Sequence, residues 1–147
     1  MRASVPTATL TILGKGAMEP DASALAACDA SVRTRIDPSR EEIFSVLEAS
    51  KVLVLPSQPT SRWREQVGLP IVEGLASGCL IVTTGETGIA DWLEAHGHTV
   101  VDTDDDLLSA AISDALRSDR TPGSVLADLP PVDGRMDAER WLFEVVR

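Results

Sequence analysis

Short apolar runs alternate with amphipathic segments along this chain. The apolar runs are expected to form β-strands over residues 8–13, 31–36, 52–55, 80–83 and 99–101. The amphipathic segments are expected to form helices over residues 39–47, 70–77, 89–96 and 104–117. Because strands and helices alternate, the sequence predicts an α/β fold with a doubly wound, mostly parallel, Rossmann-like sheet. In such sheets ligands bind at the carboxyl ends of the strands.

The length of 147 residues allows one hydrophobic core, so we expect a single α/β domain over residues 1–120. Residues 121–134 are rich in proline and glycine and predict a loop. The apolar positions that follow predict a C-terminal helix within residues 135–147.

The formal net charge of −10 argues against a surface for nucleic acid or anionic membrane, because phosphate binding needs clustered Lys and Arg. The sequence contains neither a membrane-spanning apolar run nor a signal-peptide core, so the default expectation is a cytoplasmic location. Cys28 and Cys79 have no metal-site spacing and are expected to be reduced and mostly buried.

Candidate chemistry lies between the apolar runs at residues 52–55 and 80–83, where a loop leads into a helix. Gly68 allows a ligand to approach the backbone. The amides near Leu69 and Ile71 are expected to point out of the helix N-terminus, where they form a site for phosphate. Glu73, placed in the first turn, can accept hydrogen bonds from a ribose diol, and Glu65 lies across the phosphate site. Two carboxylates around a cluster of amide donors suit a nucleotide sugar.

Plainer explanations exist for both carboxylates. A glutamate in the first turn of a helix is stabilised by the macrodipole by ~0.3–1 kcal/mol without any ligand. Glu65 is equally explained as a solvated loop residue. Spacing alone therefore does not decide between a ligand site and an ordinary helix start.

A longer set of motifs resembles the donor site of retaining GT-B glycosyltransferases. Those enzymes usually carry LPS, EGFGLPxxEAxAxG, a VIA strand and a GG loop. The matching segments here are Leu55-Pro56-Ser57, Glu65-x7-Glu73 around Gly68-Leu69-Pro70, Leu75-Ala76-Ser77-Gly78, Ile81-Val82-Thr83-Thr84 and Thr87-Gly88-Ile89. Leu13-Gly14-Lys15-Gly16 is similar to the family's GxG. The helix that starts near Asp106 is similar to the last regular segment of the family. The resemblance covers residues 8–118.

The resemblance implies a role for each matching position. It implies that Glu73 holds the ribose hydroxyls and that Glu65 faces the donor sugar as the catalytic carboxylate. The other donor-binding candidates are Val67, Gly68 and Leu69 for backbone amides, Arg35 and Ile36 at the base-binding loop, Gly14 and Gly16 at the crevice edge, and Arg64 as a nearby cation. It implies neither a metal nor a cofactor besides the nucleoside-diphosphate sugar.

Some positions depart from the family pattern. Gln66 and Val67 replace a small residue and Phe, and Leu80 replaces a frequent Pro. The family's first strand and helix, with the Arg and Lys that neutralise the pyrophosphate, have no counterpart before Ala8. Lys15, Arg62 and Arg64 are the nearby cations, so weak donor affinity is expected. The unmatched strand would lie at the sheet centre, so two open edges are expected, and the acceptor-binding domain has no counterpart either.

Weaker signals have structural explanations beside functional ones. The acidic run at Asp102, Asp104, Asp105 and Asp106 fits helix N-capping better than a metal site. His96 and His98 flank Gly97 at a helix end, where a cation favours the helix dipole. Trp63 can line a sugar pocket or pack on the domain surface.

Three functions follow from these observations. The first is the donor-binding part of a glycosyltransferase, inactive alone, which transfers a sugar to a sugar, lipid or polysaccharide acceptor held by another domain or chain. The second is a non-catalytic nucleotide-binding or protein-interaction module that associates through open sheet edges into homo- or hetero-oligomers. The third is a sugar-nucleotide epimerase, which is disfavoured because the sequence lacks the usual histidine and acidic residues of such enzymes.

Overall fold

Helices and strands alternate in the computed structural model of the chain, which describes residues 5–58, 66–102 and 104–131 and the single positions 134, 136, 140 and 142. The elements are β1 (Leu10–Gly14), α1 (Glu19–Cys28), β2 (Val32–Ile36), α2 (Arg40–Glu48), β3 (Val52–Leu55), α3 (Leu69–Ala76), β4 (Leu80–Thr84), α4 (Ala90–Ala95), β5 (Thr99–Val101), α5 (Asp105–Arg117) and α6 (Pro122–Ala127). This order confirms the predicted α/β fold, and β3 and β5 have the predicted bounds.

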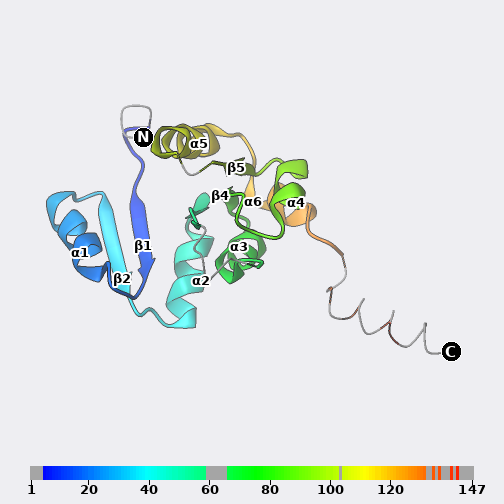
Figure 1. Ribbon diagram of the computed structural model, residues 1–147, viewed down its shortest axis with the longest axis horizontal. Helices are drawn as coiled ribbons and strands as arrows, with labels where there is room; N and C mark the ends of the chain where they lie inside the picture. The colour runs from blue at the N-terminus through cyan, green and yellow to red at the C-terminus, as the bar shows by residue number, and fades with distance from the viewer. Residues whose placement is uncertain are drawn as a thin grey trace.

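All described strand pairs are parallel, but they form two sheets. β1 pairs with β2, with Leu10 opposite Val32, and a second sheet has the order β3-β4-β5, with Val52 opposite Leu80. In Figure 1, β1 lies on the side of β2 that faces the rest of the molecule. Within the described residues, β1 and β3 are therefore each paired on one side, as the two open edges in the sequence prediction require.

The hydrophobic core belongs almost entirely to the three-stranded sheet. All five residues of β4 are buried, and helices α3, α4, α5 and α6 contribute side chains around it. The central cluster contains Leu47, Ile71, Leu75, Cys79, Leu80, Ile81, Val82, Leu93, Ala111, Ala115 and Val125. Around β1, α1 and β2, by contrast, Val32 is the one buried residue among those described. The two-stranded sheet thus has very little core of its own.

Helix α2 starts with a complete capping box. The Ser39 hydroxyl accepts a hydrogen bond from the Glu42 N–H at 3.2 Å, and the Glu42 carboxylate accepts one from the Ser39 N–H at 2.8 Å. These bonds lower the pKa of Glu42, with the backbone bond from Ser39 as the largest cause. The cap satisfies N–H groups at the helix start that have no carbonyl partner within the helix. Ser39 and Glu42 therefore define where α2 begins.

A helix occupies part of the segment that was expected to be a loop. Within residues 121–134, Thr121 caps α6 by accepting a hydrogen bond from the Ser124 N–H at 3.2 Å, and Pro122 stands at the first helical position. Val125 is 1% exposed and fills the core. The proline therefore starts this helix and does not interrupt it, which corrects the loop prediction for residues 122–127.

The structure also bears on the two cysteines, the C-terminal helix and the absence of a membrane-spanning segment among the described residues. Cys28 is exposed, contrary to the prediction, whereas Cys79 is buried and its thiol donates to the Leu47 carbonyl at 3.3 Å. Burial raises the pKa of the Cys79 thiol. Most of residues 135–147, where a last helix was predicted, lie outside the described residues. No helix in the described part of the chain is long and apolar enough to cross a membrane.

Candidate functional site

The candidate site is built where the loop after β3 enters α3. Gly68 precedes the helix with φ +79°, a left-handed conformation that favours glycine. A Cβ there would lie 3.0 Å from Ile71 Cδ1 and 3.3 Å from Leu55 Cδ2. Ile71 is fully buried while Leu69 is 74% exposed, so the helix turns its first residue toward solvent and its third toward the core.

The amides at the start of α3 differ from the prediction in one respect. The Ile71 N–H donates to the Gly68 carbonyl at 2.8 Å, so it does not point out of the helix as expected. Pro70 has no N–H, which leaves the Leu69 N–H as an amide with no carbonyl one turn earlier in the helix. Leu69 is therefore the amide donor that α3 itself can offer to an anion.

Glu73 lies in the second turn of α3, and not in the first turn as the sequence suggested. It is the fifth residue of the helix, and α3 has no acidic residue in its first turn. The stabilising effect of the helix macrodipole falls off within the first turn. It is therefore a weaker explanation of Glu73 than was expected from the sequence. The Glu73 side chain is 24% exposed, and its Oε1 lies 3.4 Å from Nη2 of Arg40 at the start of α2.

A neighbouring loop clamps the segment that leads into α3. The Gly88 N–H donates to the Gln66 carbonyl at 2.8 Å, and the Thr87 hydroxyl donates to the Val67 carbonyl at 2.8 Å. A Cβ on Gly88 would lie only 2.3 Å from the Gln66 oxygen, so this backbone contact requires glycine. The Thr87-Gly88 motif therefore holds the loop that carries Val67 and Gly68.

A second group of candidate residues lies at the carboxyl ends of β1 and β2. The Asp37 N–H donates to the Gly14 carbonyl at 3.1 Å, and Lys15 Nζ lies 2.8 Å from the Asp37 carboxylate. Asp37 has φ +47°, a turn conformation that aspartate tolerates. The space next to Gly14 and Gly16 is open, since a Cβ on either would meet no atom within 4 Å.

The structure brings some of the candidate residues together and does not describe others. Gly14, Gly16, Arg35 and Ile36 meet at one strand end, where the exposed Arg35 donates to the Thr34 carbonyl and Ile36 is 38% exposed. Glu65 and Arg64, together with Arg62 and Trp63, lie outside the described residues. Arg40 was not among the candidates, because its contact with Glu73 depends on how α2 packs against α3.

The acidic run and His98 are explained by local structure. Asp104 caps α5 by accepting hydrogen bonds from the Asp106 and Leu107 amides at 2.9 and 3.0 Å, which confirms the capping interpretation. His98 is 6% exposed, and burial lowers its pKa to about 4, followed by the charge of Arg120. His98 is therefore neutral near pH 7, so a cation at the helix end is the wrong interpretation for this residue.

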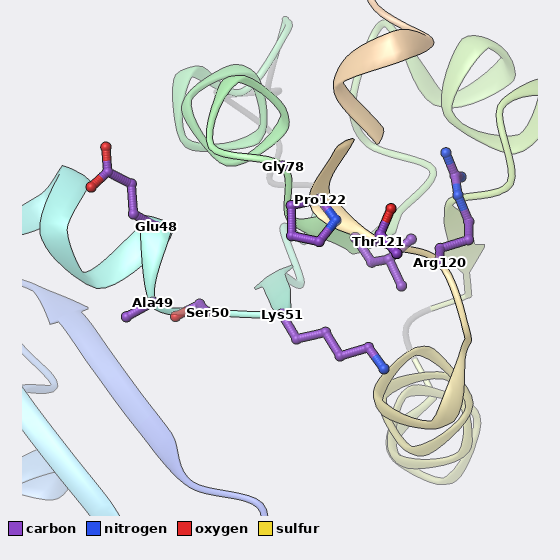
Figure 2. Close-up of a pocket in the computed structure, with 9 residues that line it drawn as sticks. Glu48, Ala49, Ser50, Lys51, Gly78, Arg120, Thr121 and Pro122 are labelled. Carbon is purple, nitrogen blue, oxygen red and sulfur yellow. The ribbon is translucent and has the colours of Figure 1, made fainter. Parts of the chain in front are cut away.

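A cavity of about 350 Å³ lies at the opposite, amino ends of β3 and β4. Its lining residues are Glu48, Ala49, Ser50, Lys51, Gly78, Leu80, Arg120, Thr121 and Pro122. In Figure 2, Lys51 extends toward the end of α5, where its Nζ donates to the Leu116 and Ser118 carbonyls at 2.7 and 2.6 Å. This cation serves the helix terminus, and the cavity contains none of the candidate site residues.

The alternating helices and parallel strands define a Rossmann-like α/β class of domain. The sequence matches the family of glycosyl transferases group 1 over residues 1–118, so the chain belongs to that family. No curated protein matches the sequence.

Among solved structures, the chain is similar to WaaG, a glycosyltransferase involved in lipopolysaccharide biosynthesis. The TM-score is 0.58 at 17% sequence identity, and the match covers 82% of this chain but 31% of WaaG. The likeness supports the GT-B, Rossmann-like architecture, and the chain spans about a third of the length of that protein.

Proposed function

We propose that this chain binds the nucleoside-diphosphate sugar for a glycosyl transfer. The Glu73 carboxylate accepts hydrogen bonds from the ribose hydroxyls, and the start of α3, with the Leu69 amide, receives the diphosphate. Glu65 faces the sugar, and Arg35 and Ile36 lie beside the base. The observation that supports this most is a partly shielded carboxylate, 24% exposed, on the helix whose N-terminus follows Gly68, in a member of a glycosyltransferase family.

In this proposal the reaction moves the sugar to the acceptor with retention of configuration. The departing diphosphate is stabilised by the helix N-terminus and by cations, without a metal. The rate comes mainly from holding donor and acceptor in a reactive geometry, because the described residues at the site offer no obvious general base.

The acceptor side has to come from elsewhere in this proposal. The chain spans about a third of the length of WaaG, and a sugar, lipid or polysaccharide acceptor would be held by a further domain or a partner chain. An extended segment from that source can pair with the open edges of β1 and β3. Sugar transfer by the isolated 147-residue chain is therefore expected to be undetectable, and robust turnover would contradict this part.

Donor binding can be tested by calorimetric titration of the isolated chain with UDP-sugars and GDP-sugars. Glu73→Ala is expected to weaken binding by roughly 10–100-fold, the cost of losing hydrogen bonds to a charged group. Glu94→Ala changes an exposed glutamate on α4 and serves as the control that leaves affinity unchanged. Equal affinity of the Glu73→Ala and Glu94→Ala variants would sink the donor-binding proposal.

A second candidate is a non-catalytic interaction module, and the divided sheet favours it. β3 has the composition of a central strand, yet all four of its residues are only partly buried. Such a strand needs a covering partner whether or not a nucleotide binds. The same titration separates the candidates, since the module predicts association without Glu73-dependent nucleotide binding.

A further inference from the structure

Arg40 places a positive charge beside the carboxylate of the candidate site. Its Nη2 atom lies 3.4 Å from Glu73 Oε1, and its Cζ atom lies 5.5 Å from the centre of the Phe44 ring, one turn along α2. The Arg40 side chain is 78% exposed. The guanidinium is thus held by two contacts while most of it faces solvent.

The ion pair alone does not explain this arrangement. A pair whose cation is largely exposed contributes little to stability, because water and salt screen it. The stacking on Phe44 adds orientation, since a guanidinium over an aromatic face is held in one direction. Arg40 is therefore positioned before any ligand arrives.

The site also needs a cation. The chain carries a formal charge of −10, and a diphosphate at the start of α3 would lie close to the Glu73 carboxylate. Lys15 is already paired with Asp37 at 2.8 Å. A guanidinium has five N–H donors, so Arg40 can keep its contact with Glu73 and still bind a phosphate oxygen.

We propose that Arg40 bridges Glu73 and the diphosphate of a bound nucleotide, as a positioning residue for the first and a direct ligand of the second. This inference rests on the proposed function, since it takes the nucleotide to bind at Glu73. It explains how a strongly acidic chain can accept a dianionic group next to a carboxylate.

The test compares nucleotides with nucleosides. UDP, GDP, uridine and guanosine are titrated into the wild-type chain and into Arg40→Ala, Arg40→Lys and Arg33→Ala, the last an exposed arginine on β2 as control. Arg40→Ala is expected to weaken diphosphate binding by about tenfold, to change nucleoside binding by less than about twofold, and to reduce the salt dependence of diphosphate binding. Arg40→Lys should recover part of the loss, and Arg33→Ala should match the wild type.

Three results would overturn the inference. Equal weakening of nucleosides and diphosphates in Arg40→Ala would mean that Arg40 acts only through Glu73. Unchanged diphosphate binding would mean that it takes no part. Failure of every probe to bind the wild-type chain would remove the proposed function and this inference together. If Arg40→Ala weakens diphosphates while Glu73→Ala leaves all probes unaffected, the phosphate contact stands and the ribose role of Glu73 falls.

Discussion

The two ring nitrogens of His98, just before β5, have different surroundings. Nδ1 accepts a hydrogen bond from the Ile81 N–H at 3.1 Å, which requires the neutral ring. Nε2 is buried and has no hydrogen-bond partner among the described residues. Trp92 stacks over the ring with centres 6.2 Å apart. Protonation would break the bond to β4 and put a charge into the core, so the fold itself disfavours it.

The chain is therefore expected to lose stability in mild acid. The pKa of His98 is lowered from 6.5 to about 4, so above pH 6.5 the residue is neutral in both states and contributes no pH dependence. As the pH falls from 6.5 toward 4, the unfolded chain binds the proton first, and the free energy of unfolding drops by up to about 3 kcal/mol. Urea unfolding at a series of pH values measures this slope.

A paired substitution assigns the slope to one residue. His98→Gln should flatten the curve between pH 6.5 and 4, although the variant starts from lower stability. His96→Gln, which changes the histidine whose Nδ1 lies 2.7 Å from the Trp92 carbonyl, should leave the slope in place. A wild-type slope that persists in His98→Gln would assign the effect to other groups.

Single residues divide into those that sequence can identify and those that it cannot. The helix start after Gly68 was predicted, because residue type and spacing carry information about the backbone, whereas the donor-binding roles of Gly68 and Glu73 stay predictions. The contact of Arg40 with Glu73 was not predicted, because the two residues lie 33 positions apart on different helices. The burial of His98 was also hidden, since a histidine beside a glycine at a helix end is usually exposed there.

At the scale of elements, the segment before α3 is fixed from both sides. Gly68 packs against Ile71 and Leu55, and the Thr87-Gly88 loop binds the carbonyls of Gln66 and Val67. Side-chain hydroxyls of β4 add to this, as Thr83 donates to the Leu55 carbonyl at 2.8 Å. The start of α3 is thus prearranged by the protein's own contacts.

Gly68→Ala is expected to destabilise the chain by about 1–3 kcal/mol, because the φ of +79° is strained for alanine and its Cβ would lie 3.0 Å from Ile71. Gly85→Ala is the matched control, since a Cβ on Gly85 meets nothing within 4 Å. Denaturant midpoints of the two variants provide the measurement. Similar midpoints would show that the loop relaxes around the added methyl group.

The prediction of elements succeeded where the pattern was strong. β3 and β5 were predicted to the residue, because an apolar run with clear breakers has few alternatives. α1 was not predicted, since it buries no residue and so shows no apolar stripe. α6 was taken for a loop because its proline and glycine are ordinary loop residues, whereas the Thr121 cap and the buried Val125 place them in a helix.

At the scale of the whole molecule, the open strand edges can be assigned to particular residues. The Leu10 N–H donates to Ser31, so alternation along β1 turns the backbone groups of Thr11 and Leu13 away from β2. The Lys51 carbonyl accepts from Leu80, so Val52 and Val54 present theirs away from β4. These four positions are where an added parallel strand would pair.

The isolated chain is therefore expected to self-associate as its concentration rises. Thr11→Pro removes an N–H on the open side of β1 and should reduce association without breaking a bond to β2. Thr11→Val keeps the N–H and should behave as the wild type. Sedimentation velocity at several concentrations distinguishes the variants, and a wild type that stays monomeric throughout would contradict this use of the edges.

The division into two sheets also has an entropic consequence. A nucleotide that contacted β1 and β2 as well as α3 would have to fix two units against each other, and that ordering would be subtracted from its affinity. A strand paired beforehand with both edges would remove this loss. Strand complementation and nucleotide binding would then be positively cooperative, each raising the affinity of the other by the same factor.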